Sequence, residues 1–366
     1  MMEPFYGIAL TQVKGVGHIL AKHLLAHFGT AEAVFAADRK SLMAVAGVGE
    51  HLAAAIRDAQ VLRGAEKEWS FVEKHRINLM LWGDDAYPRR LMECPDAPVL
   101  LYYQGKAGLN SKRVVSIVGT RDATVYGKAL CDELIEALKP YDVLVVSGLA
   151  HGIDSYAHAA SVKNDIPTVG VLGHGLDRVY PAVNRELAGA LLSAGGGLLT
   201  EYPSGTNPDR QHFPERNRVI AGLADVTVVV EAAQKGGALI TAEIANSYNR
   251  DVCAFPGNTR QASSAGCNYL IKTHRAHLIT GINDLVYLMD WLPDKAAPES
   301  RQIQMPLDLS TTEQRIYNLV EANGRIGVDL LSLKAEMPQS KLAITLLEME
   351  MKGLLVALPG KVYCLG

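Results

Sequence analysis

The chain has 366 residues, of which 48% are hydrophobic and 20% charged, enough for two or three domains of roughly 150 residues each. Its 36 Lys and Arg and 39 Asp and Glu give a formal net charge of -3, so any nucleic-acid site must be local. The five cysteines form no Cys-x-x-Cys or Cys/His cluster, which disfavours a zinc site and a disulfide framework. The sequence shows no signal-peptide pattern and no apolar run of the ~18 residues that a membrane span needs, so we expect a cytoplasmic protein.

Residues 1–66 contain two similar units, built around Val13–His18 and Val45–Glu50. Each unit has a Gly-x-Gly pair followed by apolar residues at helical spacing, which predicts a helix, a glycine hairpin and a second helix. This arrangement resembles a tandem helix-hairpin-helix, or SAM-like, domain. Glycine hairpins expose amides to which a DNA phosphate can bind, but the segment has as many acidic as basic residues. DNA contact and simple helix packing therefore remain alternatives, and packing is favoured.

Residues 67–292, after a helical connector that ends near His75, alternate between apolar runs and helical patterns. The runs are rich in β-branched residues and apolar on both faces, which predicts a mostly parallel sheet covered by helices. We therefore predict an extended Rossmann-like, doubly wound α/β domain. The predicted strands are Val114–Val118, Val143–Val146, Thr168–Leu172, Leu198–Thr200, Val226–Val230 and Val252–Phe255.

Residues 293–307 are polar and contain proline, which indicates a linker. The remaining segment, residues 308–366, shows three helical patterns and a terminal hairpin that turns at Pro359 and Gly360, as in a winged helix. This segment has one more acidic than basic residue, so we favour protein contact or regulation over reading of duplex DNA.

Glycines and polar residues gather where the predicted parallel strands end, the edge at which open α/β sheets bind ligands. They occupy Gly119–Arg121, Ser147–Asp154, Gly173–Asp177 and Glu201–Gly205. Glycine turns expose amides, and the Arg121 guanidinium matches a phosphate, so this edge is expected to bind an anion. No Gly-x-Gly-x-x-Gly pattern follows the first strand, so we expect no nicotinamide or flavin cofactor.

The segment Pro208–Leu223 combines three arginines with an amide, an imidazole and a phenylalanine. Guanidinium groups interleaved with an aromatic ring are typical of single-stranded nucleic-acid binding, because the cations contact phosphates and the ring stacks on a base. The alternative is an internal ion network, in which Arg216 and Arg218 pair with glutamates and Phe213 lies in the core. Composition alone leaves these two interpretations about even.

Six motifs follow one another over residues 84–280. They are Tyr87–Leu91, Pro98–Leu100 with Tyr102, Val115–Arg121, Val146–Asp154 with Ala157 and His158, His212–Arg218, and Pro256–Gly257 with Gly266–Ile271. Together they resemble the DNA-processing protein A family, also called DprA or Smf. The resemblance implies a non-enzymatic protein that binds single-stranded DNA during natural transformation, forms a homodimer through the α/β domain and helps to load the RecA recombinase. The flanking modules also occur in that family.

The resemblance also implies a set of DNA-binding residues. Those expected to hold a backbone phosphate are Gly119, Thr120 and Arg121. Those expected to line the path of the strand are Phe213, Arg216, Asn217 and Arg218, together with Arg210, His212, Gly148 and Lys235. The chain departs from the family pattern at Gly236–Thr241, where one hydroxyl is missing, and after Ile271, where Lys272–Ala276 replaces the usual Gly-Ala.

Two other functions are considered. A nucleotide-cleaving enzyme of Rossmann-like fold would use His151, Asp154 and His158, or Glu201 and Glu231, but no nucleophile and base pair, metal cluster or phosphate-loop lysine motif is present. We expect instead that Asp154 braces its turn and that His158 is hydrogen-bonded to it. An adaptor, in which the α/β domain is only a scaffold, would not depend on Arg121 for DNA binding. No metal and no catalytic residue is predicted.

Overall fold

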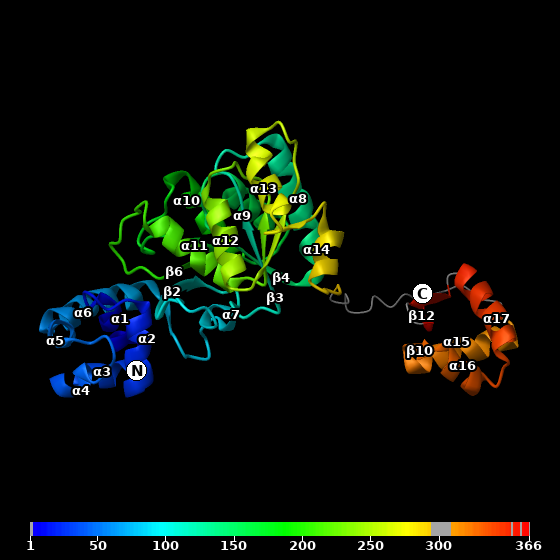
Figure 1. Ribbon diagram of the computed structural model, residues 1–366, viewed down its shortest axis with the longest axis horizontal. Coiled ribbons are helices and arrows are strands. Elements are labelled where there is room, and N and C mark those ends of the chain that lie inside the picture. The colour runs from blue at the N-terminus through cyan, green and yellow to red at the C-terminus, as the bar shows by residue number, and fades with distance from the viewer. Residues whose placement is uncertain (1–2, 294–308, 353, 359–360, 366) are drawn as a thin grey trace. The chain divides into compact units, whose positions relative to one another are not determined.

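The computed structural model describes residues 3–293, 309–352, 354–358 and 361–365 (Figure 1). The chain forms two compact units, residues 1–296 and 297–366. The first unit contains both the N-terminal helices and the α/β sheet, and within it we retain residues 1–66 and 67–292 as proposed domains. The predicted linker, residues 293–307, lies outside the described residues except for its first position.

The N-terminal part is helical, with two glycine hairpins as predicted. Gly15 precedes the second helix and Gly47 precedes the fifth, with φ of +94° and +90°, values that glycine adopts without strain. Both hairpins pack beside apolar side chains of the same domain. The helices are α1 (Glu3–Gln12), α2 (His18–Phe28), α3 (Ala31–Ala36), α4 (Arg39–Met43), α5 (Glu50–Ile56) and α6 (Ala59–His75).

The first hairpin contacts the α/β domain. The His18 imidazole lies 2.8 Å from the Glu201 carboxylate, and the Lys22 ammonium donates to the carbonyl of Pro95 at 3.1 Å. The buried Glu68 carboxylate accepts hydrogen bonds from the amide and hydroxyl of Ser204. These contacts favour a packing role for the first hairpin, because its side chains are already engaged within the chain.

In the described part of the chain, nine strands form one sheet in the order β1-β2-β6-β5-β4-β3-β7-β8-β9. The strands from β6 to β9 pair in parallel, and β1 and β2 extend the sheet in antiparallel fashion. Each run predicted as a strand is found, to within one or two residues, in β3 to β8. The bounds are β1 (Asn78–Leu81), β2 (Leu100–Gly105), β3 (Arg113–Val118), β4 (Val143–Ser147), β5 (Thr168–Leu172), β6 (Gly197–Thr200), β7 (Val226–Val229), β8 (Asp251–Ala254) and β9 (His277–Leu278).

Helices cover both faces of the parallel strands, as Figure 1 shows. On β3, Val115 and Ile117 face one helical layer while Val114 and Val118 face the other. The layer next to Val115 consists of α8 (Val125–Leu138), α9 (Ile153–Lys163) and α14 (Ile282–Leu288), and α10 (Arg185–Ser193) covers the same side further along. The opposite layer consists of α7 (Arg89–Met92), α11 (His212–Leu223), α12 (Gly237–Ser247) and α13 (Ala265–Lys272). The predicted doubly wound architecture is thus confirmed.

The second unit is a winged helix, as predicted. Ser310 and Glu313 form a capping box at the start of its first helix, and Ile316, Leu331 and Leu346 are fully or almost fully buried in its core. The predicted turn at residues 359–360 lies outside the described residues. The elements are α15 (Thr311–Asn323), β10 (Ile326–Gly327), α16 (Val328–Ala335), α17 (Gln339–Met351), β11 (Leu355–Leu358) and β12 (Val362–Leu365).

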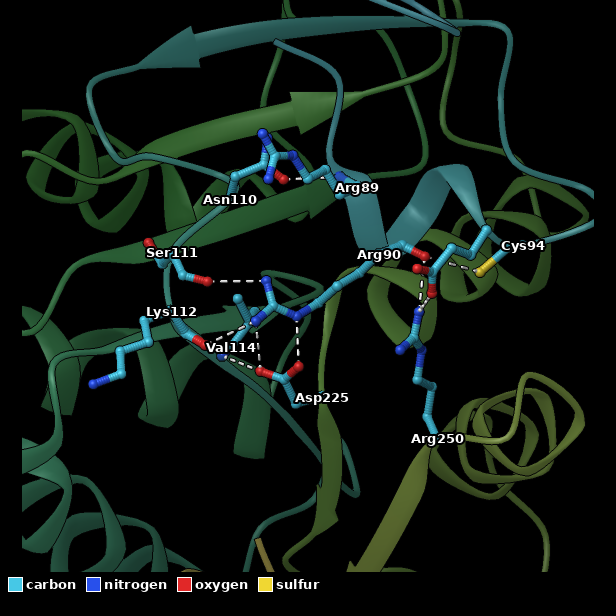
Figure 2. Close-up of polar contacts among 10 residues, drawn as sticks. Arg89, Arg90, Cys94, Asn110, Ser111, Lys112, Val114, Asp225 and Arg250 are labelled. Atoms are coloured by element: carbon cyan, nitrogen blue, oxygen red, sulfur yellow. Dashed lines mark hydrogen bonds and ion pairs between the residues drawn. The ribbon is translucent and has the colours of Figure 1, made fainter. Parts of the chain in front are cut away.

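Arg90 ties α7 to the start of the parallel sheet (Figure 2). Its guanidinium forms two hydrogen bonds with the Asp225 carboxylate, at 2.5 and 2.9 Å, and donates to the carbonyls of Ser111 and Lys112. The same carboxylate accepts the amide of Val114 at 2.8 Å. Because these groups come from α7, from the segment before β3 and from the residue before β7, one side chain fixes three parts of the fold.

We expect Arg90→Met to lower the free energy of unfolding of the full chain by about 2 kcal/mol, because it leaves a largely buried carboxylate and two carbonyls without their donor. Urea denaturation measures this change. The control is Arg275→Met, which removes a half-exposed ion pair with Glu243 and should cost less than about 1 kcal/mol. Equal losses in the two variants would contradict the role given to Arg90.

Candidate nucleic-acid interface

The order of the parallel strands reverses between β3 and β7, which makes this the topological switch point at which doubly wound sheets bind ligands. A cavity of about 700 Å³ opens there. We call it the switch-point cavity. Its lining includes Gly119, Thr120, Arg121 and Asp122 after β3, Ala232, Ala233, Lys235, Gly236 and Gly237 after β7, and Arg210, Phe213, Arg216 and Asn217 in or just before α11.

Hydrogen bonds to neighbouring elements fix the loop after β3, which lines this cavity. The Thr120 amide donates to the Glu231 carbonyl at 2.7 Å, and the Ile153 amide donates to the Thr120 carbonyl at 3.1 Å. The Glu231 carboxylate accepts the amide and hydroxyl of Thr124, which caps α8. Glu231, a candidate for catalysis, therefore serves to hold the loop that presents Arg121.

Arg121 is exposed and forms no ion pair within the described residues. The Arg121 guanidinium instead makes a cation–π contact, in which its carbon lies 5.9 Å from the centre of the Phe213 ring. The Phe213 ring is half-buried and stacks on Tyr180 at 5.7 Å with an interplanar angle of 26°. Arg121 and Phe213 thus place a free cation beside a partly exposed aromatic ring, and both line the cavity.

Two more cations of the cavity are free in the described structure. Arg210 and Lys235 are exposed, and neither has a hydrogen bond or an ion pair among the described residues. The first lies just before α11 and the second just before α12. Together with Arg121 they leave three basic side chains available to an anionic ligand.

Arg216 differs from these three because its side chain is buried and fully engaged. It donates to the carbonyl of Gly148 at 2.6 Å and to that of Val171. Burial lowers the pKa of Arg216 to about 10, although the nearby Asp154 carboxylate opposes this shift. A Cβ on Gly148 would lie 2.8 Å from the guanidinium carbon, so only glycine permits this approach. Gly148 itself lines a small adjoining recess rather than the cavity.

The structure places Arg218 and His212 outside the lining of the cavity. The Arg218 guanidinium lies 2.5 Å from the buried Glu201 carboxylate, which also contacts His18. The His212 ring packs against Tyr202 at 4.4 Å. Residues two positions apart on a helix point in nearly opposite directions, so Arg216 and Arg218 face different partners. The alternative of an internal ion network therefore holds for Arg218, which pairs with Glu201. It does not hold for Arg216, which binds carbonyls and no glutamate, or for Phe213, which is half-buried.

Two features of the cavity were not predicted from the sequence. Tyr180 stacks on Phe213, although its only sequence signal is its place in the loop after β5. The first residues of α12 also line the cavity, with Gly236 and Gly237 leaving open space where a side chain would stand. A helix start of this kind presents backbone amides and a partial positive charge to an anion.

Of the other side chains considered for catalysis, Asp154 and His158 have structural partners, whereas His151 is exposed and has no hydrogen bond or ion pair among the described residues. The Asp154 carboxylate accepts the Gly148 amide at 3.1 Å, so it braces the turn as predicted. His158 is fully buried, and its Nδ1 bonds the Thr168 hydroxyl on β5 at 2.7 Å rather than Asp154. Across the described ranges, no cluster of three or more His, Cys, Asp or Glu side chains is arranged to hold a metal ion. No described helix is long and apolar enough to cross a membrane.

The fold and the cavity define the class of this protein: an extended Rossmann-like α/β protein with free cations at its switch point, an N-terminal helical domain and a C-terminal winged helix. Family models agree with all three parts. The model described as DNA recombination-mediator protein A matches residues 78–290, the SAM-like helix-hairpin-helix tandem matches residues 8–59, and the DprA winged helix domain matches residues 297–361. The chain belongs to the DNA recombination-mediator protein A family.

Relatives of known name agree with this assignment. Protein Smf of Synechocystis sp. is 34% identical over 99% of this chain and 98% of its own length. The DNA processing protein DprA of Streptococcus pneumoniae is 41% identical over 56% of this chain and 71% of its own length.

Two solved structures are similar as well. The X-ray structure of DprA from Streptococcus pneumoniae covers 79% of this chain and 98% of its own, with a TM-score of 0.64 and 32% identity. DprA from Helicobacter pylori, whose structure is described as showing a single-stranded DNA binding mode, covers 60% of this chain and 99% of its own, with a TM-score of 0.53 and 26% identity.

His158 makes a pH-dependent contribution to stability. Burial lowers its pKa from 6.5 to about 3, so the folded protein keeps it neutral where the unfolded chain binds a proton. Its contribution is therefore full above pH 6.5 and is lost as the pH falls toward 3, at up to about 1.4 kcal/mol per pH unit. Between about pH 7 and about pH 5, wild type should lose about 2 kcal/mol more unfolding free energy than His158→Asn. Urea denaturation at both pH values measures this difference, and parallel losses would refute the assignment.

Proposed function

We propose that this protein binds single-stranded DNA in the switch-point cavity. The observation that carries the proposal is the free Arg121 guanidinium beside the partly exposed Phe213 ring. A charge-assisted contact between guanidinium and phosphate positions the backbone, and the ring offers a stacking surface for an unpaired base. The description of the Helicobacter pylori structure, which refers to a single-stranded DNA binding mode, supports the same ligand for this chain.

The shape of the site favours single strands over duplex. The cations and the ring lie in a cavity at the end of a sheet, and a base must be unpaired to present its face to Phe213. The chain carries a net charge of -3, so it has no global positive field that would draw duplex DNA to it. The roles of Gly119, Thr120, Arg210, Asn217 and Lys235 in holding the strand are part of this proposal.

The wider role that we propose is that of a cytoplasmic recombination mediator. In this role the protein protects single strands taken up in natural transformation and helps to load the RecA recombinase, acting as a homodimer. The family description, DNA recombination-mediator protein A, supports a role in recombination. The first helical hairpin is engaged with the α/β domain, so we assign no strand contact in the switch-point cavity to it. The winged helix is likewise assigned to contacts outside that cavity.

Arg121→Ala should weaken binding of an oligothymidine by about 1–3 kcal/mol, because it removes a charge-assisted phosphate contact. Phe213→Ala should weaken single-strand binding by about 1–3 kcal/mol through lost stacking, with little effect on residual duplex binding. Fluorescence anisotropy over a series of salt concentrations measures both, and the salt dependence should fall for Arg121→Ala but not for Phe213→Ala.

The matched control is Arg315→Ala, an exposed arginine of the winged helix that pairs with Glu336. It should bind as wild type does. If Arg121→Ala and Phe213→Ala also bind the oligothymidine with wild-type affinity, the strand does not occupy the switch-point cavity. That result would favour the adaptor hypothesis.

We further propose that the protein cleaves no bond in its ligand. Asp154, which lines the cavity, braces the Gly148 turn, and Glu231 holds Thr124. The other carboxylate of the lining, Asp122, is exposed and has no side-chain partner among the described residues with which to form an acid and base pair. Incubation with nucleoside monophosphates, followed by chromatography, should therefore yield no free base. Release of base that disappears in Glu231→Gln would establish the nucleotide-cleaving alternative.

A further inference from the structure

A second hollow lies on the other side of Arg121, between the first turns of α8 and α9. It has a volume of about 630 Å³, and we call it the α8–α9 hollow. Arg121 and Asp122 line both this hollow and the switch-point cavity, so the two spaces adjoin at the guanidinium assigned to a phosphate. The other residues that line it are Ala123, Lys128, His151, Gly152, Ser155, Tyr156, Val183 and Asn184.

The α8–α9 hollow repeats the pairing of cation and ring that marks the switch-point cavity. The Lys128 ammonium lies 4.7 Å from the centre of the Tyr156 ring, as Arg121 lies over Phe213. In the described structure Lys128 has no ion pair and no hydrogen bond from its ammonium group. Tyr156 is 36% exposed and its hydroxyl forms no hydrogen bond among the described residues, so both side chains are available to a ligand.

The hollow itself is preformed by the backbone around it. The buried Asn184 amide donates to the carbonyls of Leu149 and Ala150 and so fixes the rim that carries Val183, whose side chain is 71% exposed. Gly152, with φ of +75°, lets the first turn of α9 approach the carbonyls of Thr120 and Arg121. A ligand would therefore meet a fixed surface and would not have to order a loop.

The charge of the hollow suits a phosphodiester. Among the described residues that line it, Asp122 is the only carboxylate, against the two cations Arg121 and Lys128. An ammonium over an exposed ring is held weakly, whereas its contact with a phosphate is charge-assisted. A phosphate can thus draw Lys128 off the ring and leave the Tyr156 face to a base, while Val183 adds apolar surface beside it.

We propose that the α8–α9 hollow is a second subsite for the same single strand, which continues from the switch-point cavity past Arg121 to contact Lys128 through a phosphate and Tyr156 through a base. This inference rests on the proposed function, since it extends the strand whose first part lies over Phe213. It assigns DNA contact to Lys128 and Tyr156, which sequence analysis did not single out.

The experiment measures affinity for oligothymidines of graded length, from about 2 to about 12 nucleotides, by anisotropy with the full chain. Short oligomers fill the first cavity alone, so Lys128→Ala and Tyr156→Ala should show losses that grow with length, to roughly tenfold for the longest. With the longest oligomer, Lys128→Ala should also reduce the slope of log affinity against log salt by about 0.7, the value for one phosphate of a single strand. Lys128→Arg should retain both the affinity and the slope.

Matched controls come from the same domain. Lys139→Ala removes an exposed lysine at the far end of α8, and Tyr287→Ala removes a tyrosine that is 89% exposed on α14. Both should follow wild type at every length. Circular dichroism and sedimentation of each variant establish that fold and oligomeric state are unchanged.

The outcomes separate the two proposals. If Arg121→Ala weakens all lengths while Lys128→Ala and Tyr156→Ala follow wild type, the strand leaves the cavity in another direction and the second subsite is wrong. If wild type binds no oligomer at any length, both the proposed function and the subsite fail. If the Lys128 and Tyr156 variants change sedimentation but not DNA affinity, the hollow is an interface between copies of the chain, which also overturns the subsite.

Discussion

The buried guanidinium of Arg216 is the interaction on which the candidate site depends. A charge withdrawn from water is costly unless hydrogen bonds and an opposite charge compensate it, and here the carbonyls of Gly148 and Val171 and the nearby Asp154 provide both. The Gly148 and Val171 carbonyls lie at the carboxyl ends of β4 and β5. Their hydrogen bonds therefore fix α11 to the edge of the sheet at which the parallel strands end. Phe213, three residues earlier on the same helix, is thereby set beside Arg121.

This arrangement divides the basic residues of one short segment into three roles. Arg216 fixes the helix, Arg218 pairs with Glu201 near the N-terminal helices, and Arg210 has no partner in the described structure. For Arg216 and Arg218 the difference follows from helical geometry, because residues two positions apart on α11 face different surfaces, whereas Arg210 precedes the helix and is exposed. A family motif that contains Arg216 and Arg218 therefore contributes to the architecture, and the free cations beside it are the ones that a phosphate can use.

Much of the fold could be predicted from the sequence because its signals are local. Strands buried on both faces appear as apolar β-branched runs, so β3 to β8 were found from composition alone. The edge strands β1, β2 and β9 were missed. The antiparallel pairing of β2 with β6, and of β1 with β2, depends on contacts distant in sequence, and β9 has only two residues. The partners of Arg218 and the stack of Tyr180 on Phe213 are likewise set by tertiary packing, which a linear pattern does not contain.

A chain with a net charge of -3 can still select a polyanion when its free cations lie in hollows close to helix starts. At physiological ionic strength, charges beyond about 8 Å are largely screened, so the acidic residues elsewhere on the surface oppose binding only weakly. Stacking on Phe213 does not depend on counterion release, and it persists where salt weakens the phosphate contacts. Preference for an unpaired strand then follows from the rings, because a duplex can satisfy the cations but keeps its base faces stacked on one another.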